Sequence, residues 1–174
     1  MTQANVRKIT KISILVALAS ILHAVEAVIP VPYVIPGAKL GLANVVALFA
    51  VVTQGLGQSL LISFLRTLIG SLISGTFLNV GYYLSVSGAI VSTLAMYAAN
   101  RLSRGRLSVV GISVAGAFAH NTAQLVTASL ILRQAGVFFY LPYLLFFAIP
   151  TGIFVGFLAG RIISFAEKFP KLGR

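Results

Sequence analysis

The stretch "SLLISFLRTLIGSLISG" (Ser59–Gly75) is long and apolar enough to cross a membrane, yet it holds an arginine, Arg66, near its centre. A helix needs about 20 mostly apolar residues to span the hydrocarbon core of a bilayer. Arginine keeps its charge at any biological pH, so a helix in lipid must turn this side chain into the protein and give it a partner. The stretch therefore predicts a transmembrane helix with one face directed into a helical bundle.

The whole chain has the composition of an integral membrane protein. Of its 174 residues 59% are hydrophobic and 9% are charged, whereas soluble domains carry about 25% charged residues. Asp is missing, and the acids are Glu26 and Glu167. The net charge of +11 comes from short basic clusters beside apolar runs, without the interleaved aromatic residues of nucleic-acid-binding proteins. We expect membrane lipid as a partner, no nucleic acid and, without cysteine, no disulfide.

Six apolar stretches qualify as transmembrane helices and leave room only for tails and short loops. These stretches are Ile12–Ile29, Leu40–Val52, Leu56–Ser74, Phe77–Ala99, Val109–Leu132 and Phe138–Phe165. The second stretch is short, which indicates a helix that is tilted, broken or extended into its flanks. The predicted fold is an all-α integral membrane domain over residues 1–174, a compact bundle of six transmembrane helices.

Basic residues orient this bundle, because cytoplasmic segments are enriched in Lys and Arg. With the N-terminus inside, the inner segments hold ten of the 13 basic residues, the outer segments hold Lys39 and Arg133, and Arg66 lies in the membrane. Both termini are therefore expected in the cytoplasm. A cleaved signal peptide is the alternative for the first stretch, but Glu26 lies close to the candidate cleavage site and the apolar run continues past it.

Small residues at helical spacing mark faces on which helices pack closely in lipid. Such faces occur at Ser63, Thr67, Gly70 and Ser74, at Gly81, Ser85, Gly88 and Ser92, and at Gly152, Gly156 and Gly160. We interpret them as packing seams inside the bundle. The first stretch has a similar face, formed by Ser13, Ala17, Ser20 and Ala24, and Glu26 projects from nearly the opposite side. This face either docks on a partner helix or packs internally like the others.

Polar side chains at membrane depth are costly and therefore usually mark a site or a pair. The candidates for a ligand-binding site are His23, Glu26, Asn44, Arg66, Asn79, Tyr83, His120, Asn121 and Gln124. Arg66 either pairs with Glu26 or binds an anionic group of a ligand, which its planar guanidinium suits. Asn121 and Gln124 are also candidates for interhelical hydrogen bonds. The two histidines have too few acidic or thiolate neighbours for a metal site to be expected.

The segment "IPVPYVIPGAKLG" (Ile29–Gly41) joins the first two stretches on the outer side. Its prolines prevent a regular helix, and Gly37 permits a sharp turn. Tyr33 and Lys39 contribute an aromatic ring and a cation as further candidates for substrate contacts. The segment is either a lid over a polar cavity or a re-entrant connector.

Three blocks of sequence carry a resemblance to a known family. They are "EAVIPVPYVIPGAKLGLAN" (Glu26–Asn44), "RTLIGSLISGTF" (Arg66–Phe77) and "AHNTAQL" (Ala119–Leu125). They resemble a bacterial membrane family catalogued as heptaprenyl diphosphate synthase component I, or Gx transporter, over nearly the whole chain. This family is related to the S components of energy-coupling factor transporters, six-helix proteins that capture vitamins or related compounds outside the cell.

The resemblance implies several properties. The chain is expected in the bacterial inner (cytoplasmic) membrane, where it binds a small-molecule substrate. A transmembrane coupling protein with two ATPase subunits is the implied partner, with the face of Ser13, Ala17, Ser20 and Ala24 as the docking surface. The segment Ile29–Gly41 is then the implied lid.

Two functions remain open. The first is a substrate-binding subunit of a transporter for a small anionic or isoprenoid- or quinone-related compound, energised by partner ATPases. The second is a non-catalytic accessory or scaffold in polyprenyl diphosphate or quinone synthesis or in a redox complex. A transporter should hold a cavity lined by Arg66, Glu26 and the polar face of Val109–Leu132, whereas a scaffold should bury those groups against each other.

We expect neither enzymatic activity nor a cofactor in this chain. Prenyl-chain synthases bind diphosphate through magnesium held by clustered aspartates, and this sequence has no Asp. It also has no Walker A motif, so ATP hydrolysis would belong to partner chains.

Overall fold

The computed structural model describes residues 2–28 and 41–168, and over these residues the chain forms six α-helices, one 3-10 helix and no strand. The elements are α1 (Gln3–Val28), α2 (Leu42–Gln54), α3 (Leu56–Ile73), α4 (Val80–Leu102), α5 (Val109–Leu132), η1 (Ala135–Tyr140) and α6 (Leu141–Lys168). Five of the helices are long and apolar enough to cross a membrane, which confirms the predicted all-helical membrane fold. The predicted lid, with Tyr33 and Lys39, lies outside the described residues except for its last residue, Gly41.

The helix boundaries differ from the apolar stretches where local chemistry intervenes. α4 begins at Val80 because Asn79 caps it, its side-chain oxygen accepting the backbone N–H of Tyr82 at 3.0 Å. The predicted stretch starts at Ile12, whereas α1 begins at Gln3. The helix also includes the exposed basic residues that precede the apolar run. α2 has 13 residues and is therefore about 20 Å long, which is too short for a hydrocarbon core of about 30 Å. The second predicted span is thus a helix but not a full crossing.

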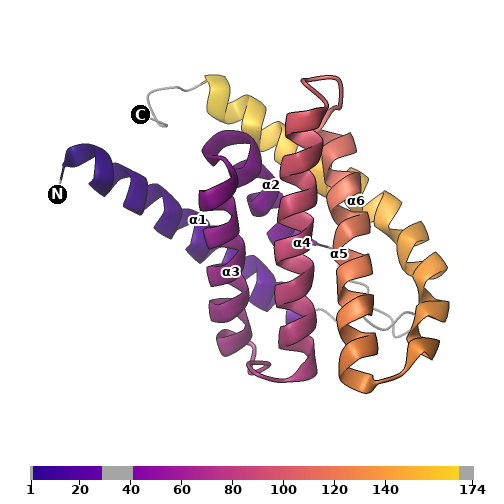
Figure 1. Cartoon of the computed structure of the whole chain (residues 1–174). Coiled ribbons are helices and arrows are strands. Elements are labelled where there is room, and N and C mark those ends of the chain that lie inside the picture. The colour runs from indigo at the N-terminus through magenta and orange to yellow at the C-terminus, as the bar shows by residue number, and fades with distance from the viewer. Residues whose placement is uncertain (1, 29–40, 169–174) are drawn as a thin grey trace.

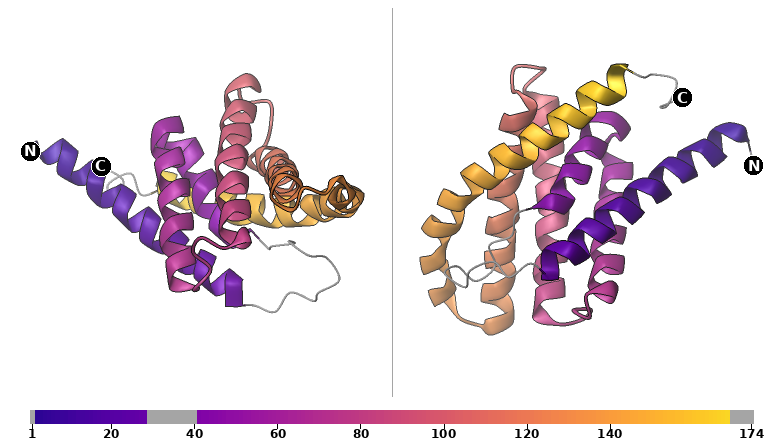
Figure 2. Two further views of the ribbon diagram at one scale, coloured as in Figure 1. Left: turned by 60° about the horizontal axis from the view of Figure 1, so that its bottom comes forward. Right: turned by 180° about the vertical axis from the view of Figure 1, so that it is seen from behind.

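The helices form two layers around α2. α3, α4 and α5 stand side by side, and α1 and α6 cross them obliquely on the other face (Figure 1; Figure 2, right). α2 contacts α1, α3, α4 and α6, and seven of its 13 residues are buried. Leu48 and Val51 of α2 pack with Met96 of α4, whereas Val46 packs with Val16 of α1. The shortest α-helix is therefore the centre of the bundle.

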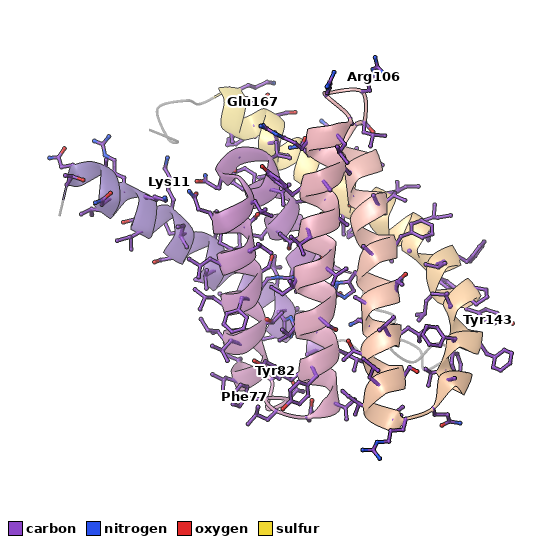
Figure 3. The ribbon with its side chains drawn as sticks, viewed as in Figure 1. Lys11, Phe77, Tyr82, Arg106, Tyr143 and Glu167 are labelled. Atoms are coloured by element: carbon purple, nitrogen blue, oxygen red, sulfur yellow. The ribbon has the colours of Figure 1, made fainter. Side chains whose placement is uncertain are left out.

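The two ends of the bundle differ in their side chains. The start of α1, the end of α6 and the α4–α5 turn lie at one end, and the α3–α4 turn and η1 lie at the other (Figure 1). Lys11, Arg106 and Glu167 are at the first end, whereas Phe77 and Tyr82 are at the second (Figure 3). A basic end and an aromatic end fit a bundle that crosses a bilayer.

Apolar side chains are exposed on the outer surface, and the interior holds polar residues beside its apolar core. Leu130 is 72% exposed and Phe139 is 84% exposed, in company with many other apolar side chains. The buried polar and charged residues are Ser20, His23, Glu26, Ser59, Ser63, Arg66, Thr67, Ser71, Ser85, Ser92, Thr93, Ser113 and Gln124. The many exposed apolar side chains fit a surface in contact with lipid.

Small residues let the helices approach closely at part of the predicted seams, whereas Gly81 is exposed. In the α3–α4 seam, Ser63 Oγ and Thr93 Oγ1 share a hydrogen bond of 2.7 Å. In the α5–α6 seam, a Cβ added at Gly156 would lie 2.6 Å from the Cα of Val110, so the backbones approach too closely for any side chain. At Gly160 an added Cβ would meet its nearest neighbour at 4.0 Å, an ordinary contact.

Candidate functional site

Arg66 lies on the buried face of α3 and is 3% exposed. Its Nη2 donates a hydrogen bond of 2.6 Å to Oδ1 of Asn44, in the first turn of α2. Its Nε is also buried and has no hydrogen-bond partner among the described residues. The guanidinium is therefore fixed by an amide and retains an unused donor.

Glu26 belongs to the last turn of α1, and its buried carboxylate lies beside the start of α2. Its carboxylate accepts a hydrogen bond from the backbone N–H of Gly41, the residue that precedes α2. Gly41 has φ of 76°, a left-handed conformation that favours glycine. The carboxylate complements the partial positive charge of the helix N-terminus and also acts through its charge on Arg66. Glu26, Arg66 and the N-terminus of α2 thus form one charged cluster.

Both histidine rings lie directly against a glycine of a neighbouring helix. A Cβ added at Gly70 of α3 would lie 2.7 Å from His23 Cδ2, and one added at Gly88 of α4 would lie 2.7 Å from His120 Cε1. His23 belongs to α1 and His120 to α5. The two glycines therefore make the space in which the imidazoles approach the charged cluster.

Two adjoining pockets surround these groups. The first, which we call the charged pocket, has a cavity volume of about 20 Å³ and is lined by His23, Glu26, Gly41, Asn44, Arg66, Thr67, Ser85 and His120. The second, which we call the neutral pocket, has a cavity volume of about 30 Å³ and is lined by Gly41, Asn44, Ser92, Met96, Ser113, Gly116, Ala117, His120, Asn121, Thr151, Gly152 and Val155. Three residues line both pockets, so the two are neighbouring parts of one site.

Six of the candidate ligand-binding residues meet at this site, namely His23, Glu26, Asn44, Arg66, His120 and Asn121. Asn121 also donates from Nδ2 to the backbone oxygen of Leu144 at 2.8 Å, which joins α5 to α6. Asn79 caps α4, Tyr83 is 47% exposed and Gln124 is buried in α5. Within the described ranges these last three residues do not line either pocket.

The proposed docking face of α1 is divided between surface and interior. Ser13 and Ala17 are exposed, Ala24 is half-buried, and Ser20 is 1% exposed. The first turns of α1 extend away from the other helices, as Figure 1 shows. The exposed part of the face is therefore confined to Ser13 and Ala17.

Several pocket residues were not among the sequence candidates, notably Gly41, Thr67 and Ser85. Ser113 belongs to the polar face of Val109–Leu132 that was expected to line a cavity, and it lines the neutral pocket. Thr67 and Ser85 were assigned to packing seams. A small polar residue on a buried helix face gives the same sequence pattern whether it packs against a helix or lines a binding pocket. Gly41 lay within the apolar stretch Leu40–Val52, whereas α2 begins directly after it, at Leu42. The described part of the chain contains no group of three or more His, Cys, Asp or Glu residues placed to hold a metal ion.

The fold and the site together define a multi-pass helical membrane protein with polar pockets at its centre. The chain belongs to the family described as heptaprenyl diphosphate synthase component I, whose profile matches residues 15–162. This match confirms the resemblance predicted from the three blocks and includes both pockets. No curated protein and no solved structure matches the chain.

Proposed function

We propose that the chain is the substrate-binding membrane subunit of a transporter that takes up a small anionic compound. The observation that supports this most directly is the charged pocket, which places Arg66, Glu26 and two histidines around a common space. A scaffold would be expected to pack these groups against each other. Ionisable groups inside a membrane protein usually mark a substrate pathway or site, because their burial is costly.

Binding follows from the unused hydrogen-bonding capacity of Arg66. The ligand's anionic group accepts from Nε, while Nη2 remains held by Asn44. The N-terminus of α2, in the middle of the bundle, adds favourable charge, as the broken helices of other transporters do. Glu26 balances the guanidinium before the ligand arrives, and His23 and His120 supply further hydrogen bonds.

The partner chains follow from the family's relation to S components. We propose that a transmembrane coupling protein with two ATPases energises uptake, and that it docks on α1 at Ser13 and Ala17. The chain then lies in the bacterial cytoplasmic membrane with both termini in the cytoplasm, as the basic residues at that end indicate.

Native mass spectrometry of the gently purified chain tests the binding role. We expect a small molecule to co-purify with the wild type and to be lost from Arg66→Gln. The matched control is Arg161→Gln, because Arg161 is exposed on α6, with its guanidinium 5.1 Å from the ring centroid of Phe157. Equal occupancy of the wild type and Arg66→Gln would show that the charged pocket is not the binding site.

The family description favours a second candidate, an accessory subunit of polyprenyl diphosphate synthesis. Affinity purification from the native membrane separates the two candidates by the partner that is recovered. Under our proposal a coupling protein with ATPases is recovered, and Ala17→Leu prevents this while ligand binding persists. Recovery of a prenyl-chain synthase subunit instead, with no ATPases, would favour the accessory role.

A further inference from the structure

The first turns of α1 project sideways from the bundle. Residues 2–10 are exposed, and this part of the helix lies apart from the other helices in each view (Figure 1; Figure 2). α1 has 26 residues and is therefore about 39 Å long, which exceeds the hydrocarbon thickness of about 30 Å. Because α1 crosses the bundle obliquely, its start reaches the basic end of the bundle at a slant.

This projecting part of α1 has a basic side and an apolar side. Arg7, Lys8 and Lys11 share one side of the helix, and Val6 and Ile9 lie on the other. At 3.6 residues per turn, Ile9 is about 160° around the helix from both Arg7 and Lys11. Val6 and Ile9 are each 50% exposed. The two kinds of side chain are therefore separated on a surface that the described residues leave open.

The apolar side continues a packed face of α1 beyond the edge of the bundle. Ile12 packs against a core cluster formed by α1, α2 and α3, whereas Ile9, about one turn earlier, is exposed. The hydroxyl of Thr10 donates to the backbone oxygen of Val6 at 2.9 Å, so this polar group is satisfied within the helix. Asn5, in the first turn, is the polar exception. Hydrocarbon is a suitable cover for the remaining apolar side.

The basic side is directed toward the end of the bundle where lipid headgroups are expected. Lys11 lies on the side of α1 that faces this end, where Arg106 and Glu167 also lie (Figure 3). Val6 and Ile9, on the opposite side, therefore face back toward the level of the hydrocarbon. A helix that left the membrane upright would need no such separation, because all its sides would meet the same layer at each depth. Separated basic and apolar sides are typical of helices that lie in the membrane interface.

We propose that residues 3–12 of α1 lie in the leaflet at the basic end of the bundle and bind anionic phospholipids there. Arg7, Lys8 and Lys11 bind the headgroup phosphates, and Val6 and Ile9 insert among the acyl chains. Each basic residue close to an anionic membrane surface strengthens binding roughly fivefold. The contact fixes the oblique course of α1, and it does not depend on the pockets or on the proposed function.

The first test measures the depth of the two sides in a membrane. The chain has no cysteine, so a single fluorophore can be attached without background. Val6→Cys and Ala4→Cys are a matched pair, because both residues are exposed and lie about 160° apart around the helix. The full chain is labelled and reconstituted in vesicles of phosphatidylcholine and phosphatidylglycerol in equal parts.

We expect nitroxides on the lipid acyl chains to quench the label at position 6, and aqueous iodide to quench the label at position 4. Equal access of iodide to both labels would overturn the proposal, because the helix would then lie in water. Protection of position 6 only after a partner chain is added would also overturn it, since the apolar side would then belong to a protein interface.

The second test measures the preference for anionic lipid. Native mass spectrometry of the full chain, exposed to equal amounts of the two lipids, should show more phosphatidylglycerol than phosphatidylcholine bound to the wild type. In Arg7→Gln/Lys8→Gln we expect this preference to fall by roughly tenfold. Arg101→Gln/Arg106→Gln is the matched control, because it removes two exposed arginines near the α4–α5 turn at the same end. An unchanged preference in the α1 variant, or an equal loss in the control, would overturn the proposal.

Discussion

Ser63 and Arg66 are neighbours on the same buried face of α3, but their surroundings differ. Ser63 meets Thr93 of α4 at 2.7 Å, in a closed contact between two helices. Arg66 borders the charged pocket and retains a donor without a partner among the described residues. Within a membrane bundle, polarity alone therefore does not distinguish an interhelical contact from a binding site. A buried hydrogen-bonding group that is unused and borders a pocket distinguishes a binding site from an interhelical contact.

The largest expected effect concerns the charged side of this comparison. Arg66→Leu leaves Glu26 without its nearby cation, and Glu26→Leu leaves the guanidinium without its nearby anion. Removing one partner of a buried charge pair costs about 3–5 kcal/mol, whereas removing both is much milder. We expect each single variant to lower the free energy of unfolding, measured in detergent, and the double variant to recover much of the loss.

Ligand binding should respond differently from stability in the same variants. The double variant lacks the anion receptor, so we expect it to bind no ligand even where it is well folded. Normal binding by the double variant would make Arg66 a structural residue, like Ser63.

An intermediate effect is expected in the closed α5–α6 seam. A Cβ at Gly156 would lie 2.6 Å from the Cα of Val110, and overpacking of this kind costs about 1–3 kcal/mol. Gly156→Ala should therefore lower the free energy of unfolding by that amount. Gly160→Ala is the matched control on the same helix, because its Cβ meets nothing closer than 4.0 Å. Equal losses in the two variants would contradict the close approach of these backbones.

The smallest effect is expected at the α3–α4 seam. Ser63→Ala removes the hydrogen bond to Thr93, and such interhelical bonds contribute about 0.6 kcal/mol in a membrane protein. The same unfolding measurement should show a loss of that size, with ligand binding unchanged. A loss comparable to that of Arg66→Leu would remove the distinction between the two positions.

Much of the fold could be predicted because hydropathy reports directly on lipid contact. The stretch Val109–Leu132 coincides with α5, and Leu56–Ser74 differs from α3 by one residue. The start of α4 was harder to predict. In a sequence, an asparagine that caps a helix cannot be told from one that lies within the membrane-spanning part, as Asn79 illustrates. The position of α2 between the two layers depends on how the longer helices cross, which no local pattern records.

The candidate site could be predicted in part for a related reason. Charged and imidazole side chains such as Glu26, Arg66 and His120 are so unusual at membrane depth that composition alone selects them. Serine and threonine are common on buried faces of membrane helices, so the role of Ser113 depends on which atoms surround it. Tyr83 was a reasonable candidate by spacing, but it lies where α4 begins, at the end of the bundle.

The brevity of α2 also bears on biosynthesis. A 13-residue helix is well below the length that inserts independently into a bilayer as a nascent segment. Its N-terminus is held from α1, through Glu26 and Gly41, and its C-terminus leads after Gly55 directly into α3. We therefore expect α2 to leave the translocon together with α3 as a helical hairpin. A chain truncated after residue 54 should fail to retain α2 in the membrane, whereas one that extends through α3 should retain it.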